Sequence, residues 1–478
     1  ADESADYFAY DKRGNLLYKK EGDTRLTEYT YDETGRLTAV TDVFGNRTLY
    51  DYDKAGNLIK ETAPDGSKNV YAYDGAGRMV SETLSDGGSY LYEYDLRGNL
   101  TKLTGPTGIE ARFSYDENGS LISLADAKGE TRYEYDCLNR LTEIVDALGG
   151  KTIYTYDGDG NVTSVSYGDE ALYQYQYDEN GRLAGITLPS GLQTDYAYDT
   201  KGQLLKETAY DKNAGNNTDA RVSAYTYDKT GNLTGVTDAL GGKSVYAYDS
   251  MGRLTEFTSP GGMETTFTYD ALSNIKTITD GAGNRTSYLY DAKGRLRHED
   301  IAGEESYTYA YDAMDRLISI EGEDSLVSYS YHQNGQLSGV TDSNGNTTSY
   351  EYDKAGNLIK TTDPLGNQAS YAYDEAGNLS EAKDENGNTT TYDYDALNRL
   401  VSKDTKESLS TASYGYDSMG RLTLMDDVTG ESLYTYDEAG RVTKAKDGNG
   451  REISYEYDAF GNVTEVTYPD GRKVSYTY

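Results

Sequence analysis

The sequence has no tryptophan, one cysteine, two histidines, six prolines and no long hydrophobic run. Cys137 stands alone, which excludes an intrachain disulfide and a cysteine metal site. No apolar stretch approaches the roughly 20 residues that a membrane-spanning helix needs. The first residues have neither the basic start nor the apolar stretch of a signal peptide. These absences argue against a disulfide-stapled fold and against a helical membrane protein.

Positive charge is also scarce. The chain has 45 lysines and arginines against 81 aspartates and glutamates, so its formal net charge is -36. A field of this sign repels nucleic acid and anionic lipid, and no cluster of basic residues offsets it. The charge therefore predicts no nucleic-acid partner.

Apolar residues are too few for a large spherical core. They make up 36% of the chain even when tyrosine is included, and the mean hydropathy is -0.78. Disorder is one interpretation of so polar a chain. A thin structure in which each unit packs only on its neighbours is the other. The regular spacing of tyrosine and leucine excludes disorder and predicts the layered structure.

An aromatic pair recurs along the chain, nearly always at a spacing of 21 residues, from Phe8 and Tyr10 to Tyr476 and Tyr478. The two positions of the pair hold 43 of the 51 tyrosines. The octapeptide DKAGNLIK occurs at residues 53–60 and again at 353–360, because both copies stand at the same place in the repeat. Side chains two residues apart point to the same face of a β-strand, so each aromatic pair predicts a strand.

A glycine follows the second tyrosine by four residues in 18 of 22 complete units. The exceptions are Asn139, Ser273, Asp315 and Asn398. Glycine, asparagine and aspartate tolerate positive φ best, so this position predicts a tight hairpin turn. An Arg or Asn and an aliphatic residue then begin a second strand, where an apolar spacing of three predicts a bulge or a strong twist. A second turn, often Asp-x-x-Gly, holds all six prolines.

Each unit therefore reads as strand, turn, strand, turn, and about 22 units predict about 44 strands. Because an open sheet rarely exceeds about ten strands without curling, we predict an all-β fold. It is an antiparallel β-hairpin ribbon coiled into a spiral, forming a hollow shell or tube. We expect one continuous repeat domain over residues 1–478, with an insertion loop near 210–223, as a segment of a longer chain. The repeat positions singled out, in the two copies of the octapeptide and the tyrosines before them, are Tyr50, Tyr52, Asp53, Gly56, Leu58, Tyr350, Tyr352, Asp353, Gly356 and Leu358.

Residues with catalytic chemistry are either rare or repeated. His298 and His332 lie 34 residues apart, with no nucleophile pattern near either one. The Asp after the second tyrosine recurs in 21 of 22 units, which is typical of a turn cap that binds backbone N–H groups. Carboxylate pairs are plentiful, but the turns lack the dense aspartate spacing of calcium repeats. We predict no catalytic residue, no metal and no cofactor.

The repeat resembles the RHS and YD-repeat family. The stretches YTYDETGRLTAVTDVFGN (residues 29–46) and YEYDAFGNVTEVTYPDG (residues 455–471) are similar to its consensus, and the resemblance covers essentially the whole chain. The family includes bacterial RHS toxins, wall-associated proteins, shell components of insecticidal toxin complexes and teneurins. The resemblance implies a β-ribbon that spirals into a hollow shell, which in the toxin members encloses a C-terminal toxic domain. DPLG at residues 363–366 stands at an ordinary second turn and is not interpreted as the family's cleavage site.

Three functions are compatible with these patterns. The first is a secreted or surface-exposed bacterial shell without catalysis, whose partner is an encapsulated or fused toxin or cargo domain. The second is a cell-surface protein for adhesion or carbohydrate binding, in which tyrosine rows stack on surface glycans. The third is an extracellular fibre that grows by end-to-end self-association. Tandem regularity and the family resemblance favour the shell.

Overall fold

The computed structural model describes residues 6–21, 25–168, 171–214, 220–406 and 410–478. These residues form 45 β-strands, one short 3-10 helix, η1 (Lys212–Ala214), and no α-helix. Consecutive strands pair antiparallel, and all strands belong to one sheet. The prediction of an all-β antiparallel hairpin ribbon is confirmed.

The odd-numbered strands from β1 to β43 carry the aromatic pairs, whereas β45 ends just before the last pair, Tyr476 and Tyr478. Their bounds are β1 (Tyr7–Tyr10), β3 (Arg25–Tyr31), β5 (Arg47–Tyr52), β7 (Lys68–Tyr73), β9 (Ser89–Tyr94), β11 (Glu110–Tyr115), β13 (Gly129–Tyr135), β15 (Lys151–Tyr156), β17 (Ala171–Tyr177), β19 (Leu192–Tyr198), β21 (Arg221–Tyr227), β23 (Lys243–Tyr248), β25 (Glu264–Tyr269), β27 (Arg285–Tyr290), β29 (Ser306–Tyr311), β31 (Leu326–Tyr331), β33 (Thr347–Tyr352), β35 (Gln368–Tyr373), β37 (Thr389–Tyr394), β39 (Ser410–Tyr416), β41 (Gly430–Tyr436), β43 (Glu452–Tyr457) and β45 (Lys473–Ser475).

The even-numbered strands begin with the aliphatic residue that follows the first turn. Their bounds are β2 (Leu16–Glu21), β4 (Leu37–Thr41), β6 (Leu58–Thr62), β8 (Met79–Thr83), β10 (Leu100–Thr104), β12 (Leu121–Asp126), β14 (Leu141–Val145), β16 (Val162–Tyr167), β18 (Leu183–Thr187), β20 (Leu204–Asp211), β22 (Leu233–Thr237), β24 (Leu254–Thr258), β26 (Ile275–Thr279), β28 (Leu296–Ile301), β30 (Leu317–Glu321), β32 (Leu337–Thr341), β34 (Leu358–Thr362), β36 (Leu379–Lys383), β38 (Leu400–Thr405), β40 (Leu422–Asp427), β42 (Val442–Lys446) and β44 (Val463–Thr467).

The first turn of each unit is a tight hairpin with a left-handed residue. Gly56 has φ 98°, and its N–H donates to the Asp53 carbonyl at 3.2 Å. The four units without glycine use the same backbone conformation: φ is 62° at Asn139, 65° at Ser273, 64° at Asp315 and 60° at Asn398. The turn geometry is therefore set by position in the repeat, and glycine is the residue that adopts it at the lowest cost.

The irregularity predicted in the second strand is a β-bulge. Tyr52 lies opposite Leu58, but its neighbour Asp51 lies opposite Lys60, so the register skips one residue. The same shift recurs one unit after another, for example between β13 and β14 and between β43 and β44. Because of the bulge, two apolar residues spaced by three point to the same face of the ribbon.

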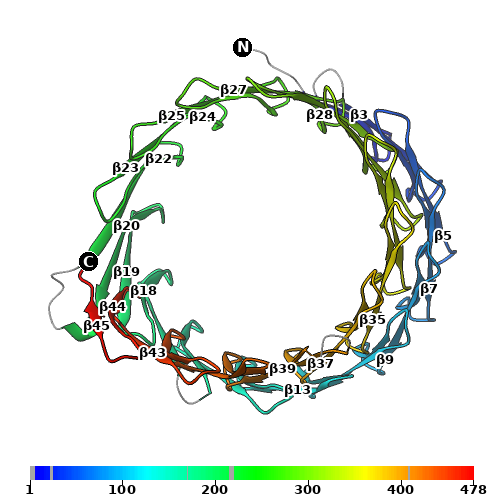
Figure 1. Ribbon diagram of the computed structural model, residues 1–478. Coiled ribbons are helices and arrows are strands. Elements are labelled where there is room, and N and C mark those ends of the chain that lie inside the picture. Colours follow the sequence, from blue (N-terminus) through cyan, green and yellow to red (C-terminus); the bar gives the residue numbers. More distant parts are fainter. Residues whose placement is uncertain (1–5, 22–24, 169–170, 215–219, 407–409) are drawn as a thin grey trace. The chain divides into compact units, whose positions relative to one another are not determined.

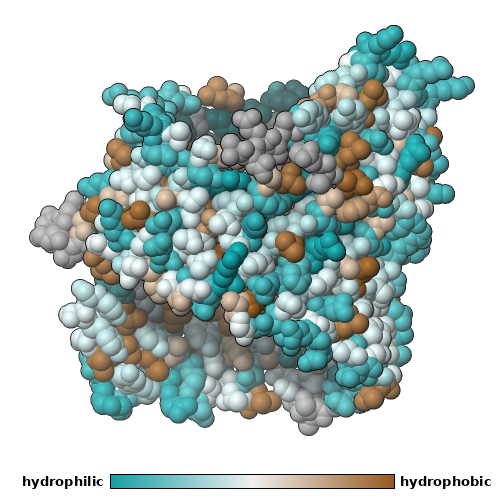
Figure 2. All heavy atoms as spheres, turned by 90° about the horizontal axis from the view of Figure 1, so that it is seen from above, coloured by the Kyte–Doolittle hydropathy of each residue, from teal (hydrophilic) through white to brown (hydrophobic). Residues whose placement is uncertain are grey.

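The ribbon has almost no closed core. Among the described residues, the buried hydrophobic side chains are Ala39, Val165, Ala369 and Val466. Large apolar side chains at turn tips face solvent instead, with Leu240 98% and Leu365 87% exposed. On the face that Figure 2 shows, hydrophobic residues are scattered among hydrophilic ones and form no broad patch. Stability therefore depends on contacts between neighbouring units, as in other repeat proteins.

The chain divides into two compact parts, unit 1 and unit 2, each of which contains many of the 21-residue repeats. Unit 1 comprises residues 1–110 and 246–370, and unit 2 comprises residues 111–245 and 371–478. Within each unit the ribbon passes twice, so that two segments far apart in sequence lie side by side (Figure 1). We call each segment a pass, and the line along which the two passes of one unit meet the seam. The seam shows that the ribbon returns upon itself, as a coiled ribbon must.

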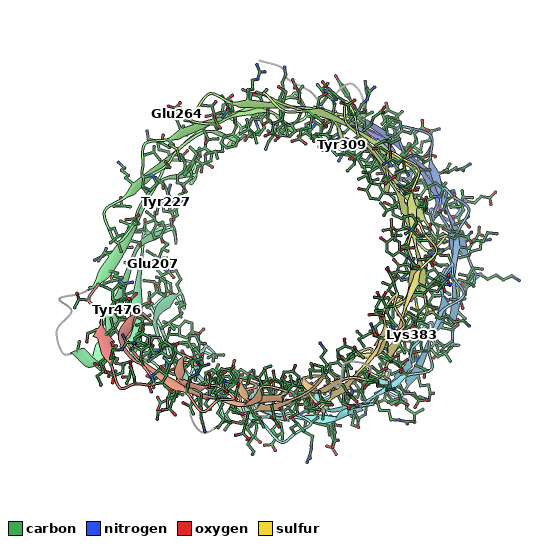
Figure 3. All side chains as sticks on the ribbon, in the orientation of Figure 1. Glu207, Tyr227, Glu264, Tyr309, Lys383 and Tyr476 are labelled. Carbon is green, nitrogen blue, oxygen red and sulfur yellow. The ribbon has the colours of Figure 1, made fainter. Side chains whose placement is uncertain are left out.

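The tyrosines lie on one face of the ribbon. In unit 1 the ribbon is curved, and Figure 3 shows Tyr309 on its concave face and Glu264 on its convex face. In unit 2, Tyr227 and Glu207 lie together on the concave face. The sequence alone left open which face is concave. The concave face of each unit is the tyrosine face.

The insertion near residues 210–223 extends one hairpin. Strand β20 continues to Asp211 and pairs with β19 over seven residue pairs, and η1 follows directly. Gln193, only 3% exposed, donates to Asp195 there, and the Tyr210 hydroxyl donates to the other oxygen of the same carboxylate. Residues 215–219, the middle of the insertion, lie outside the described residues.

The positive φ of the first turn makes a testable prediction. Gly56→Val is expected to lower the free energy of unfolding by about 1 kcal/mol or more, because a β-branched side chain is strained at φ 98°. Gly75→Val, at an exposed turn glycine without positive φ and with open space around it, is the matched control. Urea unfolding of both variants measures the difference. Equal stability of the two variants contradicts the turn assignment.

Candidate functional site: the repeated turn, the tyrosine face and the seam

The recurring aspartate caps its own turn. Oδ1 of Asp53 accepts the N–H of Asn57 at 2.9 Å, and Oδ2 accepts Nδ2 of Asn57 at 2.9 Å. In the second copy, Asp353 accepts the backbone and side chain of Asn357 in the same way. The hydrogen bonds from the Asn57 side chain and backbone hold the pKa of Asp53 below its ordinary value. The repeated carboxylate is therefore occupied by the turn.

In some repeats an arginine stands in place of this asparagine, and its side chain joins two neighbouring repeats. Nε of Arg140 donates to Asp136 of its own turn at 2.7 Å, and Nη1 donates to the Asp157 carbonyl of the next turn at 3.1 Å. Its guanidinium also lies 4.6 Å from the ring centroid of Tyr156, a cation–π distance. Ten arginines of the described residues stack in this way on the second tyrosine of the following unit: Arg36, Arg78, Arg140, Arg182, Arg253, Arg295, Arg316, Arg399, Arg421 and Arg441.

The second tyrosine adds a further bond between neighbouring repeats. We call the arginine and tyrosine contacts together the clamp. The tyrosine hydroxyl donates to the carbonyl of the aliphatic residue that begins the second strand one unit earlier, as in Tyr156 to Leu141 at 2.6 Å and Tyr457 to Val442 at 2.8 Å. At least fourteen tyrosines make this bond. Sequence reasoning missed the clamp. The signal was the nearly constant offset between each turn arginine and the next second tyrosine.

The singled-out positions fall where the repeat requires them. The guanidinium of Arg36 lies 5.1 Å from the ring centroid of Tyr52. Tyr352 instead meets the ring of His332 edge-on, with the two ring centroids 5.9 Å apart. Leu58 and Leu358 lie opposite these second tyrosines, and the first tyrosines Tyr50 and Tyr350 lie opposite Glu61 and Thr361. Gly56 and Gly356 both have positive φ. The two sets occupy equivalent turns in the two passes of unit 1. Their role as repeat positions stays a prediction.

Two tyrosines on the concave face are hydrogen-bonded to glutamates of the neighbouring strand. The Tyr225 hydroxyl donates to Glu207 at 3.0 Å, and the Tyr309 hydroxyl donates to Glu299 at 3.0 Å. Burial, together with the hydrogen bond to the carboxylate, raises the pKa of Tyr225 and of Tyr309 to about 12. These pairs add negative charge to the concave face and keep the phenols neutral.

The raised pKa predicts a loss of stability in alkali. The neutral form of Tyr225 is favoured by folding, so its contribution is complete below pH 10 and is lost as pH rises from about 10 to about 12. The stability advantage of the native chain over Tyr225→Phe is therefore expected to shrink across that interval. Urea unfolding of both proteins at pH 8 and pH 11 measures it. An advantage that stays constant with pH contradicts the assigned pair.

The seam is held by charged and polar groups at the turn tips. In unit 1, Lys293 of one pass lies 2.6 Å from Asp42 of the other, and Asn334 donates to Asp86 at 2.8 Å. In unit 2, Lys128 donates to Asp374 at 2.6 Å. Burial opposes ionisation of Asp374, but the hydrogen bonds from Lys128 and Asn378 outweigh it and lower its pKa to about 2. Second turns of the earlier pass thus meet first turns of the later pass.

The histidines take part in local contacts. His298 Nδ1 lies 3.2 Å from the Thr308 hydroxyl on the neighbouring strand, and His332 Nε2 lies 3.0 Å from the Tyr350 carbonyl. No group of three or more His, Cys, Asp or Glu side chains in the described part of the chain is arranged to hold a metal ion. Within the same residues, no helix has the length and apolar character needed to cross a membrane.

A ribbon of tandem 21-residue hairpins clamped by tyrosine and arginine defines a YD-shell repeat protein. The chain belongs to the Teneurin YD-shell family, whose model matches residues 109–217 and 262–412, more than half of the chain. The RHS Repeat model matches residues 10–47, 31–68, 73–111, 227–262 and 433–478. The family resemblance seen in the sequence is confirmed. A search of curated proteins finds no match.

Several solved structures share the fold. One is a crystal structure of TcdB2-TccC3-TEV (TM-score 0.70, 16% identity), covering 96% of this chain and 30% of that one. Another is TcdB2-TccC3-Cdc42, also with a TM-score of 0.70 and 16% identity, covering 98% and 30%. A third is the Photorhabdus luminescens Tc holotoxin pore, with a TM-score of 0.63 and 15% identity, covering 98% and 31%. The chain therefore spans about three tenths of the length of these proteins, and the likeness concerns the fold.

Proposed function

We propose that the chain is a non-catalytic shell segment that encloses or displays another domain, such as a toxin. The observation that carries the proposal is that the recurring polar side chains form hydrogen bonds within the wall itself. The aspartate of each first turn binds its own turn, and the arginines and second tyrosines bind neighbouring units. A repeat whose recurring aspartates, arginines and second tyrosines serve the wall is suited to building a surface rather than to catalysis.

Family membership supports the same function. The matching family is a YD-shell. Two of the structures that share the fold are of TcdB2-TccC3-TEV and TcdB2-TccC3-Cdc42, and a third is a Tc holotoxin pore. Because the chain spans about three tenths of the length of these structures, we infer that it is a segment of a longer protein. We also infer that a cargo domain is its main partner and that the protein is secreted or displayed on a bacterial surface.

Electron microscopy of the native protein, combined with its intact mass, tests the proposal. The expected result is a hollow particle with additional internal density and a polypeptide mass well above 52.6 kDa. Limited proteolysis adds a second readout, because an enclosed domain resists cleavage until the wall is unfolded. An open ribbon or a fibre without contents, together with a cargo domain cleaved as fast as a free one, contradicts the proposal.

A further inference from the structure

The seam of unit 1 uses only one edge of each pass. It takes the second turns of the earlier pass and the first turns of the later pass, as at Asp42 and Lys293. The other two edges of turns lie away from the seam. The first turns of the earlier pass form one of them, which we call the leading edge: residues 11–14, 32–35, 53–56, 74–77 and 95–98. The second turns of the later pass form the other, which we call the trailing edge: residues 259–262, 280–283, 301–304, 322–325, 342–345 and 363–366.

Both of these edges are open to solvent. The two central residues of every turn on them are exposed. At the seam, by contrast, both central residues are shielded in the first turns that contain Lys293 and Met314, and the Lys293 side chain is only 19% exposed. Apolar side chains stand at both open edges, with Leu96 fully exposed on the leading edge and Leu365 87% exposed on the trailing edge. Covering such side chains is favourable.

The central positions of the two open edges carry opposite charge, although the whole chain is acidic. The leading edge holds four bases and one acid at these positions: Lys12, Arg13, Lys54, Arg97 and Glu33. The trailing edge holds two acids and no base there: Glu323 and Asp324. Opposite charges attract across an interface and disfavour the pairing of two like edges. The charges therefore favour contact between a leading edge and a trailing edge.

The seam shows that these two kinds of edge fit each other. There Lys293, from a first turn, lies 2.6 Å from Asp42, from a second turn. The ring of Phe44 at the tip of the same second turn is covered by the guanidinium of Arg295, 5.2 Å from its centroid. Leu365 stands at the position of Phe44 in its own second turn, but it is exposed. The pairing that joins the two passes within one chain is thus available between two chains.

We propose that the trailing edge of unit 1 docks on the leading edge of unit 1 in a second copy of this chain. The acids Glu323 and Asp324 then face the bases of the leading edge, and Leu365 is covered as Phe44 is at the seam. Because two different edges meet, the contact is heterologous and leaves one edge of each kind open at the ends of the pair, so further copies add in the same way. The inference does not rest on the shell function, because the contact needs no enclosed domain.

Sedimentation velocity of the full chain over a range of concentrations tests the contact. At an ionic strength of about 0.15 M the Debye length is about 8 Å, so the general repulsion between two acidic chains is screened while groups in contact still interact. The sedimentation coefficient is expected to rise with concentration. A leading-edge variant, Lys12→Glu with Lys54→Glu, and a trailing-edge variant, Glu323→Lys with Asp324→Lys, are each expected to weaken self-association about tenfold or more.

Mixing the two variants is expected to restore association, because the reversed leading edge of one then meets the reversed trailing edge of the other. Lys68→Glu with Lys276→Glu is the matched control, since it changes the net charge equally at exposed strand positions of unit 1 outside both edges. Circular dichroism melting verifies that each variant is folded. A chain that stays monomeric at every concentration, a mixture that does not associate, or an equal loss in the control overturns the proposal.

Discussion

Gly448→Ala is expected to lower the free energy of unfolding by about 3 kcal/mol, at the upper end of the usual cost of overpacking. A Cβ at this position overlaps the Thr429 carbonyl oxygen and lies 2.7 Å from the Thr429 carbonyl carbon. These are backbone atoms of the preceding second turn, held by β40 and β41, so they do not rotate aside as a side chain does. The two turns approach so closely that only glycine fits.

Gly158→Ala is the matched control for this effect. Gly158 also follows the aspartate of an Asp-Gly-x-Gly turn, but an added Cβ meets no atom within 4 Å. Its stability is expected to stay within about 0.5 kcal/mol of the native chain, because it touches nothing. Thermal and urea unfolding of both variants measure the difference. Similar stabilities for the two alanine variants show that the turn at 447–450 is free to move.

Lys128→Ala is expected to separate the two passes of unit 2 locally, at a cost of about 2 kcal/mol, between the values for exposed and buried ion pairs. The Lys128 side chain is 18% exposed, it bonds Asp374, and it lies 5.9 Å from the ring centroid of Tyr394. Its loss leaves the Asp374 carboxylate partly buried without its cation. Hydrogen exchange at the turn 374–377 is expected to accelerate, while exchange in the strands far from the seam stays unchanged.

The same contact depends on pH. Folding lowers the pKa of Asp374 to about 2, so its contribution is complete above the ordinary aspartate value near 3.8 and is lost as pH falls toward about 2. The native chain should therefore lose this part of its stability in acid, whereas Lys128→Ala should lose less. Lys444→Ala removes an ion pair with Glu452 that is exposed on both sides, and it serves as the control. A seam whose exchange rates are the same in all three proteins contradicts this role of Lys128.

Local structure followed from the sequence because its causes are local. Period-two tyrosines predicted the strands, the glycine at Gly56 and its non-glycine equivalents predicted positive φ, and the spacing of three predicted the bulge. Each of these features depends on backbone sterics within one hairpin. A chain that repeats the same local choice more than twenty times leaves little room for another fold.

Contacts between neighbouring repeats, and between the two passes of one unit, did not follow from the sequence. The role of Arg140 depends on the curvature that brings the Asp157 carbonyl and the Tyr156 ring beside it, and one repeat alone does not define curvature. The partner of Lys128 is set by how many units the ribbon travels before it returns.

The seam has a consequence for how such chains change in length. Its partners are 246 to 249 residues apart at Lys128–Asp374, Asn334–Asp86 and Arg25–Asn274, close to twelve repeats. Between Ser190 and Ala459 the separation is 269, about one repeat more. Arg221, in the repeat after Ser190, stacks on Phe460 of the same first turn, so two successive repeats of one pass contact a single turn of the other. The gain or loss of one repeat by unequal recombination can be accommodated by such a change of turn partner, so the number of repeats is free to drift while the two passes stay in contact.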